Sequence, residues 1–210
     1  MRRPEVTINC AASIDGKISS PGRTHLTLSG REDMRRVMKL RAAHDAIAVG
    51  VNTVISDNPS LTVRGVRSGK RPVRVVFDSR GRTPAEAKIF DGNAKTIIFT
   101  AVGTHMKSAA AEVISCGKER VDIVRALSIL YRMGIRSLLV EGGGELIFSF
   151  ISFHLVDTLM IYTSPVVIGG RTSPTIADGT GFKGGKMLER LRLIRLTKLG
   201  TGYLAEYRPL

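Results

Sequence analysis

The sequence predicts one α/β domain, in which a mixed and mostly parallel sheet is flanked by helices and ends in an antiparallel hairpin. The first observation is that strand-like and helix-like runs alternate along most of the 210 residues, and parallel neighbours need such crossover connections. The second is a pair of strand-like runs in residues 187–208 that meet near Gly200 and Gly202, as in a hairpin. No repeat, low-complexity tract or linker interrupts the chain, so residues 1–210 are expected to form a single domain.

The first part of the chain predicts a strand, a helix and a second strand. The apolar run at residues 6–12 is rich in β-forming residues and breaks at a turn dipeptide. Ser29 and Glu32 have the spacing of a capping box, and apolar residues at helical intervals continue the helix to about residue 43. The apolar run at residues 45–50 ends in glycine and is typical of a parallel strand that is covered on both faces.

The rest of the chain repeats this alternation. Residues 121–133 carry apolar side chains at helical intervals and stop before Gly134, a typical glycine at a helix C-terminus. Residues 135–151 predict a strand, a glycine loop and a helix, and residues 156–170 predict a long strand. The remaining expected elements are strands at residues 71–78, 95–100 and 112–115 and a short helix from Thr104.

The charge of the chain indicates an anionic partner or a solvated basic surface. The net charge is +14, from 32 basic and 18 acidic residues, which suits nucleic acid or a small molecule with several phosphates. Aromatic residues make up only 5% and Trp is absent, so a stacking platform for single strands is poorly supplied. No helix-turn-helix, zinc-finger or RNA-binding signature occurs, and a nucleic-acid-binding module is kept only as an alternative.

The sequence predicts neither a membrane segment nor a metal site. The longest apolar stretch, residues 146–156, is too short for a membrane helix, and the first residues lack a secretory pattern. Cys10 and Cys116 belong to no CxxC pair, and no two of the four histidines have metal-ligand spacing. We therefore expect a cytoplasmic protein without a bound metal.

A glycine triplet between a buried strand and a helix is the clearest candidate binding loop. Gly142, Gly143 and Gly144 lack Cβ atoms, so their backbone N–H groups are accessible to a ligand. The N-terminus of the following helix adds partial positive charge, and the pattern therefore favours a pyrophosphate. Glu141 stands at the carboxyl end of the strand, where open α/β sheets bind ligands. A flexible turn without a ligand is the alternative.

Two further polar loops follow predicted strands. After residues 71–78, Arg80 and Arg82 are suited to a ribose 2′-phosphate, which favours NADP over NAD, although each arginine alone is equally consistent with a solvated turn. After residues 45–50, the chain offers the hydroxyl of Thr53, the carboxylate of Asp57 and the guanidinium of Arg64. On spacing alone, capping groups and a surface arginine explain this second loop.

The order of these segments is more specific than any one of them. ASIDGKI, LSGREDM, LRAAHDAIAVGVNTVISDNPSLTVR, RVVFDSRGRTP, LLVEGGGELI and VDTLMIYTSPVVIGG together resemble the riboflavin-pathway reductase family, from Val6 to about Arg208. This resemblance implies a dihydrofolate-reductase-like fold, NADPH as cofactor, a homodimer, and hydride delivery to C1′ of the opened ribosyl chain of a phosphorylated pyrimidine. The HxE and PCxxC motifs of the family's deaminase half do not occur here, so the chain resembles the stand-alone reductases and the diamino pyrimidine is the favoured substrate.

The resemblance also implies a role for each matching position. The expected cofactor contacts are Thr53, Asp57, Ser79, Arg80, Gly81, Arg82, Gly142, Gly143, Gly144 and Glu145. The expected substrate contacts are Lys17, Arg41, Leu61, Arg64 and Glu141, of which the two arginines suit the ribose 5-phosphate. The candidates for proton handling are Asp57, Lys17 and Glu141, in that order.

The sequence is also consistent with three other functions. A related enzyme that acts on the deaminated pyrimidine or on a pterin has the same sequence pattern. A basic nucleic-acid-binding module and a non-catalytic subunit are the alternatives outside enzymes, and the intact polar positions at the strand ends argue against the second of these.

Overall fold

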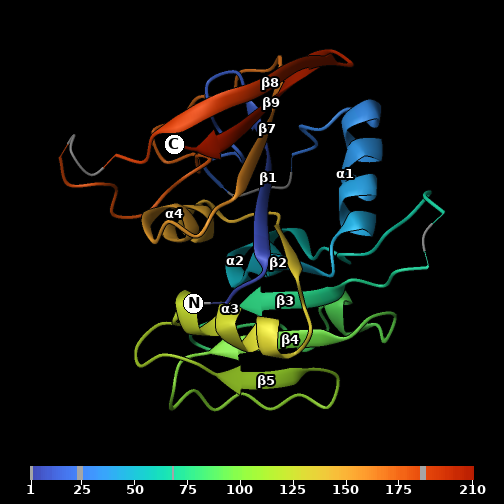
Figure 1. Ribbon diagram of the computed structural model, residues 1–210, viewed down its shortest axis with the longest axis vertical. Helices are drawn as coiled ribbons and strands as arrows, with labels where there is room; N and C mark the ends of the chain where they lie inside the picture. Colours follow the sequence, from blue (N-terminus) through green and yellow to red (C-terminus); the bar gives the residue numbers. More distant parts are fainter. Residues whose placement is uncertain (1, 23–25, 68, 185–187) are drawn as a thin grey trace.

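The computed structural model describes residues 2–22, 26–67, 69–184 and 188–210. Within these residues the strands form one nine-stranded sheet, and helices cover both of its faces (Figure 1). The strands are β1 (Glu5–Ser13), β2 (Ala46–Gly50), β3 (Val73–Phe77), β4 (Thr96–Thr100), β5 (Glu112–Ser115), β6 (Ser137–Val140), β7 (Thr158–Ser164), β8 (Leu191–Leu199) and β9 (Gly202–Pro209). The helices are α1 (Arg31–Ala43), α2 (Val51–Asp57), α3 (Ile123–Arg132) and α4 (Gly144–Ser152), with a 3₁₀ turn η1 (Lys88–Phe90).

The sheet is parallel except at its C-terminal edge. The strand order is β5-β4-β3-β2-β6-β1-β7-β9-β8. Strand β6 pairs with β1 on one side and β2 on the other, all in parallel, while β9 pairs with both β7 and β8 in antiparallel. The predicted mixed sheet with a terminal hairpin is therefore confirmed.

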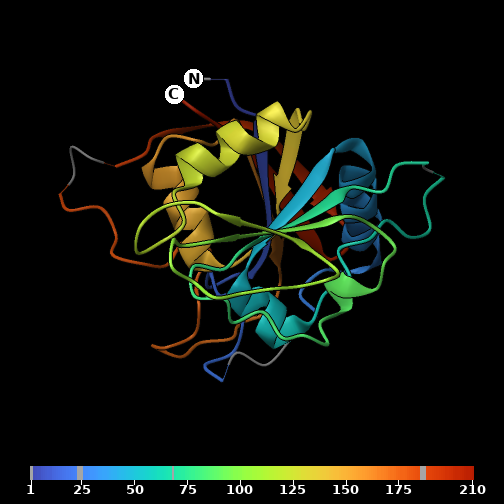
Figure 2. The same cartoon turned by 90° about the horizontal axis from the view of Figure 1, so that it is seen from below.

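The two faces of the sheet carry separate apolar clusters. On β2, Ala46 and Ala48 point into the cluster that includes α3 and α4, while Ile47 and Val49 point into the cluster that includes α2 and η1. This alternation is the period-two pattern of a strand that is buried on both faces. Seen from below, α3 and α4 lie on one side of the twisted sheet and α2 on the other (Figure 2).

Three local predictions are wrong. Residues 104–110 form no helix, and the strand predicted for 156–170 ends at Ser164, because Pro165 lacks the N–H that would continue the ladder. The capping box is also absent. Gly30 is the N-cap of α1, and the Ser29 hydroxyl donates to the Asp33 carboxylate at 2.6 Å instead.

The sequence pattern did not predict helix α2 or the short turn η1. Helix α2 has only seven residues, too few to show a helical period, and it follows β2 without an intervening loop. Val51 and Val54 are buried against the sheet, and Asn58 ends the helix in the left-handed conformation (φ 42°), directly before Pro59. As a result, Thr53 and Asp57 lie on a helix and not in an open loop.

Candidate active site

A cavity of about 920 Å³ runs along the carboxyl ends of four neighbouring parallel strands. Its lining includes Cys10 of β1, Gly50 of β2, Phe77 of β3 and Glu141 directly after β6. Ligands of open α/β sheets bind at this edge, because the loops that follow the strands converge there. The volume is in the range of cavities that hold a cofactor or a substrate.

The glycine turn forms one wall of the cavity, as the sequence predicts. Gly142 and Gly143 have φ values of 145° and 86°, which side chains with a Cβ rarely adopt. The Gly142 carbonyl accepts from the Gly50 N–H at 3.3 Å, so the turn is fastened to the start of α2. Gly143 is the N-cap of α4 and brings no capping side chain. The first N–H groups of α4 therefore remain for an anion.

Thr53 and Asp57 line the cavity from α2. The Thr53 hydroxyl lies against the glycine turn, 3.6 and 3.5 Å from the ideal Cβ positions of Gly142 and Gly143. Asp57 is exposed one turn further along the helix, and its Oδ1 accepts from the Ser56 hydroxyl at 2.9 Å. One short helix thus presents a hydroxyl and a carboxylate to the same space.

The loop after β3, residues 78–83, carries Arg80 and Arg82 and is called the arginine loop below. Hydrogen bonds hold it at both ends. The buried Asp78 carboxylate accepts from the N–H and the hydroxyl of Thr83, both at 2.7 Å. Ser79 accepts the Val121 N–H on its hydroxyl at 3.0 Å. Arg80 and Arg82 are exposed and line the cavity, and Arg82 also donates to the Asn52 side chain of α2 at 2.8 Å. Gly81, the remaining residue of this loop, is not part of the lining.

Glu141 and Arg41 form an ion pair on the opposite side of the glycine turn. The Nε and Nη2 atoms of Arg41 donate to the two carboxylate oxygens of Glu141 at 2.9 and 2.7 Å. The Nη1 atom of Arg41 donates to the Thr62 carbonyl at 2.9 Å. The Arg41 guanidinium is therefore engaged on all three nitrogens, and only Glu141 of this pair lines the cavity.

Three other predicted residues lie outside the cavity lining. Leu61 is buried in the core cluster of α2 and η1, with φ 48°. Arg64 is exposed, and its guanidinium donates to the hydroxyls of Ser60 and Thr62. The Lys17 backbone N–H donates to the Ser13 hydroxyl at 2.9 Å, and its side-chain amine lies 3.5 Å from the Ser173 carbonyl. Lys17 directly precedes Ile18 and Ser19, which do line the cavity.

Comparison with known proteins agrees with this arrangement. The family model described as the RibD C-terminal domain matches residues 4–205. The chain belongs to the RibD C-terminal domain family. The dihydrofolate-reductase-like fold implied by the resemblance is confirmed by solved RibD reductase domains.

Relatives in this family match over the full length of the chain. A protein of Archaeoglobus fulgidus named 2,5-diamino-6-ribosylamino-4(3H)-pyrimidinone 5′-phosphate reductase is 43% identical over 98% of each chain. A protein of Methanothermobacter thermautotrophicus with the same name is 40% identical over 98% of each chain. The structure of the Thermotoga maritima deaminase/5-amino-6-(5-phosphoribosylamino)uracil reductase superposes with a TM-score of 0.85 at 26% identity, over 99% of this chain and 57% of that one.

In this RibD-type site, two groups of lining residues are not among the predicted ones. One comprises Glu119, Arg120 and Val121, from the turn before α3. The other comprises residues that follow β1 and residues that follow β7, namely Ser19, Leu26, Thr27, Leu28, Ser29, Pro174 and Asp178. Leu28 and Ser29 belong to the LSGREDM segment, but neither group shows a pattern that by itself indicates ligand binding, and the tertiary structure brings them to the cavity.

The segment at residues 173–178 crosses the start of α4. The Asp178 carboxylate accepts from the hydroxyl and the N–H of Thr175 at 2.6 and 3.0 Å. A Cβ on Gly144 would lie 2.5 Å from the Thr175 carbonyl and 2.7 Å from Asp178 Oδ2. The third glycine of the triplet therefore makes room for this crossing segment.

The described residues contain no cluster of three or more His, Cys, Asp or Glu side chains that could hold a metal ion. Burial raises the pKa of the Cys10 thiol to about 12, so this lining residue stays neutral near pH 7. In the described part of the chain, no helix has the length and apolar character needed to cross a membrane.

Proposed function

We propose that this chain is an NADPH-dependent reductase of riboflavin biosynthesis. Its substrate is 2,5-diamino-6-ribosylamino-4(3H)-pyrimidinone 5′-phosphate, whose ribosyl side chain it reduces to the ribityl form by hydride transfer to C1′. The observation that carries the proposal is one continuous cavity lined by the glycine turn, the arginine loop and Glu141. The full-length relatives named for this reaction support it.

The cofactor half of the cavity is the end with the glycine turn and the arginine loop. The turn and the N-terminus of α4 suit a pyrophosphate, and Arg80 and Arg82 suit a 2′-phosphate. Thr53 is placed to donate to a phosphate or ribose oxygen from α2. NADPH, when bound, supplies the hydride, and the chain has to align the two reactants and exclude water.

The substrate half is the end near Glu141 and the loop at residues 58–64. Glu141 can accept hydrogen bonds from the pyrimidine or from the opened sugar, because its carboxylate reaches the cavity while Arg41 fixes its orientation. Arg64 is the group for the 5′-phosphate, since its guanidinium is exposed and its hydrogen bonds within the described residues go to neutral hydroxyls. Leu61 supports this loop from the core, and Lys17 supports the Ile18–Ser19 wall.

Asp57 is the first candidate for proton handling. It is an exposed carboxylate that lines the cavity from the end of α2, so it can exchange protons with solvent. Lys17 is the second candidate and Glu141 the third, because the Glu141 carboxylate is committed to Arg41.

The direct test follows NADPH oxidation in the purified protein. The diamino pyrimidine nucleotide is added while the absorbance of the reduced nicotinamide is recorded, with NADH in a parallel reaction. We expect oxidation that requires the nucleotide and is faster with NADPH. NADPH oxidation that is independent of the nucleotide, or none with either cofactor, would refute the proposed function.

A second candidate substrate is the deaminated pyrimidine. The Thermotoga maritima protein of similar structure is named as a 5-amino-6-(5-phosphoribosylamino)uracil reductase. Assaying both nucleotides at equal concentration decides between them through the ratio of their kcat/KM values. A higher kcat/KM for the deaminated compound would show that this compound, and not the diamino pyrimidine, is the preferred substrate.

We also propose that two copies of the chain form a homodimer through β8. This strand is one of the two edges of the described sheet, and it exposes Leu193, Ile194 and Leu196, the last of them at 60% of its surface. An exposed apolar edge strand promotes association, and a second copy presents the same surface. Light scattering should give twice the mass of the 22.8 kDa chain, and Leu196→Glu should shift it to the monomer mass. A monomeric wild-type protein would contradict the dimer.

A further inference from the structure

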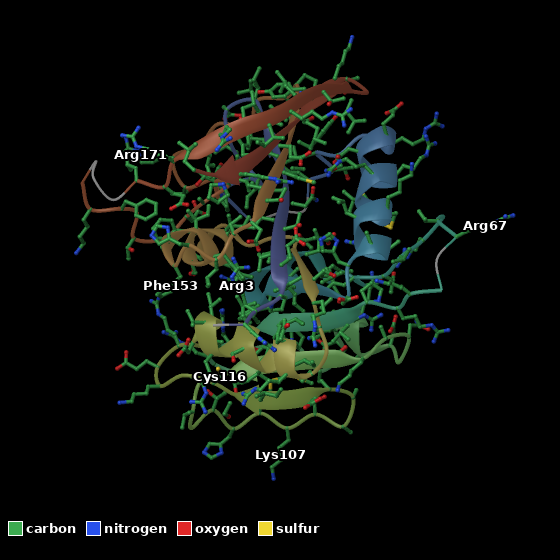
Figure 3. All side chains as sticks on the ribbon, in the orientation of Figure 1. Arg3, Arg67, Lys107, Cys116, Phe153 and Arg171 are labelled. Carbon is green, nitrogen blue, oxygen red and sulfur yellow. The ribbon has the colours of Figure 1, made fainter. Side chains whose placement is uncertain are left out.

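The tight turn between β5 and α3, residues 116–122, carries a third arginine of the cavity. The turn begins at the buried Cys116, which is labelled in Figure 3, and ends at Asp122, the N-cap of α3. The Asp122 N–H donates to the Cys116 carbonyl at 3.0 Å and closes the turn. A Cβ on Gly117 (φ 98°) would lie 2.1 Å from the Arg120 carbonyl. Only glycine fits there, so the backbone that places Arg120 is tightly defined.

This turn is fastened directly to the arginine loop after β3. The Val121 N–H donates to the Ser79 hydroxyl at 3.0 Å, and the Val102 N–H donates to the Gly117 carbonyl at 2.8 Å. The Ser79 carbonyl in turn accepts the Thr104 hydroxyl at 2.9 Å. Two loops whose linked residues are 42 positions apart in sequence are therefore held side by side at the cavity.

The two loops together form an electropositive end of the cavity. Arg80, Arg82 and Arg120 line it with one opposing charge in the same turn, Glu119. Arg82 donates to Asn52, whereas no hydrogen bond or ion pair inside the described part of the chain engages the guanidinium of Arg80 or Arg120. Guanidinium groups bind a dianionic phosphate monoester better than a neutral hydroxyl, because they donate charge-assisted hydrogen bonds to it.

We propose that Arg120 is a specificity residue that joins Arg80 and Arg82 around the 2′-phosphate of the adenosine in NADPH. This inference rests on the proposed use of NADPH and adds a residue from a separate loop. The Val121–Ser79 hydrogen bond holds the turn that carries Arg120 next to the loop that carries Arg80 and Arg82.

The test uses fragments of the cofactor, so it does not depend on turnover. Binding of adenosine 2′,5′-bisphosphate and of adenosine 5′-monophosphate is measured by calorimetry on the wild type and on Arg120→Ala. We expect Arg120→Ala to weaken the bisphosphate about tenfold, the loss of one charge-assisted contact, and to change the monophosphate less than twofold. The matched control is Arg125→Ala, which removes an exposed arginine of α3 that does not line the cavity.

The outcomes separate the inference from the proposed function. Equal weakening of both fragments, or no weakening of the bisphosphate, overturns the role of Arg120 even if the wild type prefers the bisphosphate. A wild type that binds the two fragments equally well overturns both this inference and the preference for NADPH. If Arg120→Ala unfolds, Arg120→Gln provides the same comparison with more of the side chain retained.

Discussion

Arg41 and Glu141 join α1 to the glycine turn through a bidentate ion pair, with N–O distances of 2.9 and 2.7 Å. Their side chains are only 15% and 8% exposed, so the pair is largely removed from water. The third nitrogen of Arg41 holds the Thr62 carbonyl, and thus the loop that carries Arg64. Arg41 therefore acts on the cavity through Glu141 and through this loop, because each nitrogen of its guanidinium already donates to one of them.

Replacement of Arg41 tests this role. Arg41→Ala leaves a nearly buried carboxylate without its partner, and we expect it to lower the free energy of unfolding by about 2–3 kcal/mol. The substrate KM should also rise, since Glu141 and the Thr62 loop lose their common anchor. Arg35→Ala, an exposed arginine of the same helix, is the control for urea denaturation and kinetics. Equal stability of the two variants would show that the pair contributes nothing.

Asp57 should be required for turnover. We expect Asp57→Ala to lower kcat about a hundredfold, the lower range for loss of a proton-transfer group. Asp57→Asn keeps the shape of the side chain and one accepting oxygen, but it cannot exchange a proton. If Asp57→Asn keeps the wild-type kcat, Asp57 acts in binding, and the proton is handled elsewhere.

Arg64 should act in binding and not in chemistry. Arg64→Ala is expected to raise the KM for the pyrimidine nucleotide about tenfold while kcat stays within twofold, because a phosphate contact is uniform between ground and transition states. Arg67, which projects from the tip of the same loop in Figure 3, gives a matched control in Arg67→Ala. A KM that is unchanged in Arg64→Ala would remove Arg64 from the substrate site.

Gly144 should not tolerate a side chain. In an ordinary helix Gly→Ala is stabilising, but a Cβ here would lie 2.5 Å from the Thr175 carbonyl. We expect Gly144→Ala to destabilise the protein by about 1–3 kcal/mol and to raise the KM for NADPH, because the crossing segment must shift. Gly69→Ala, where no atom lies within 4 Å, is the control in thermal denaturation. A stabilised Gly144→Ala would contradict the close approach.

Asp15 gives stability a specific pH dependence. Hydrogen bonds from the Ser13 hydroxyl and from the N–H groups of Ile168 and Gly169 lower the pKa of its carboxyl from 3.8 to about 2. A lowered folded-state pKa contributes stability above about pH 4, and that contribution is lost as the pH falls towards 2. The Tm difference between wild type and Asp15→Asn should therefore be largest near pH 6 and shrink between pH 4 and pH 2. A difference that is constant with pH would argue against this assignment.

The sequence alone determined the alternation of strands and helices and the polar loops that follow the strands. These features depend on local periods and turn residues, which each segment carries whatever its neighbours are. The resemblance to the riboflavin-pathway reductases, rather than spacing, assigned the glycine turn, the arginine loop, Thr53 and Asp57 to cofactor binding, and residues from each of them line one cavity in the structure. Helix α2 escaped prediction because seven residues cannot display a helical period.

Only the tertiary structure decided which of these groups meet. Arg41 and Glu141 are 100 residues apart, and they pair because β6 inserts between β1 and β2 in the sheet. The turn that carries Arg120 is joined to the arginine loop by a hydrogen bond between Val121 and Ser79, and no spacing in the sequence predicts this contact. Contacts of this kind follow from the order of the strands, and that order is settled by packing of the whole chain rather than by any one segment.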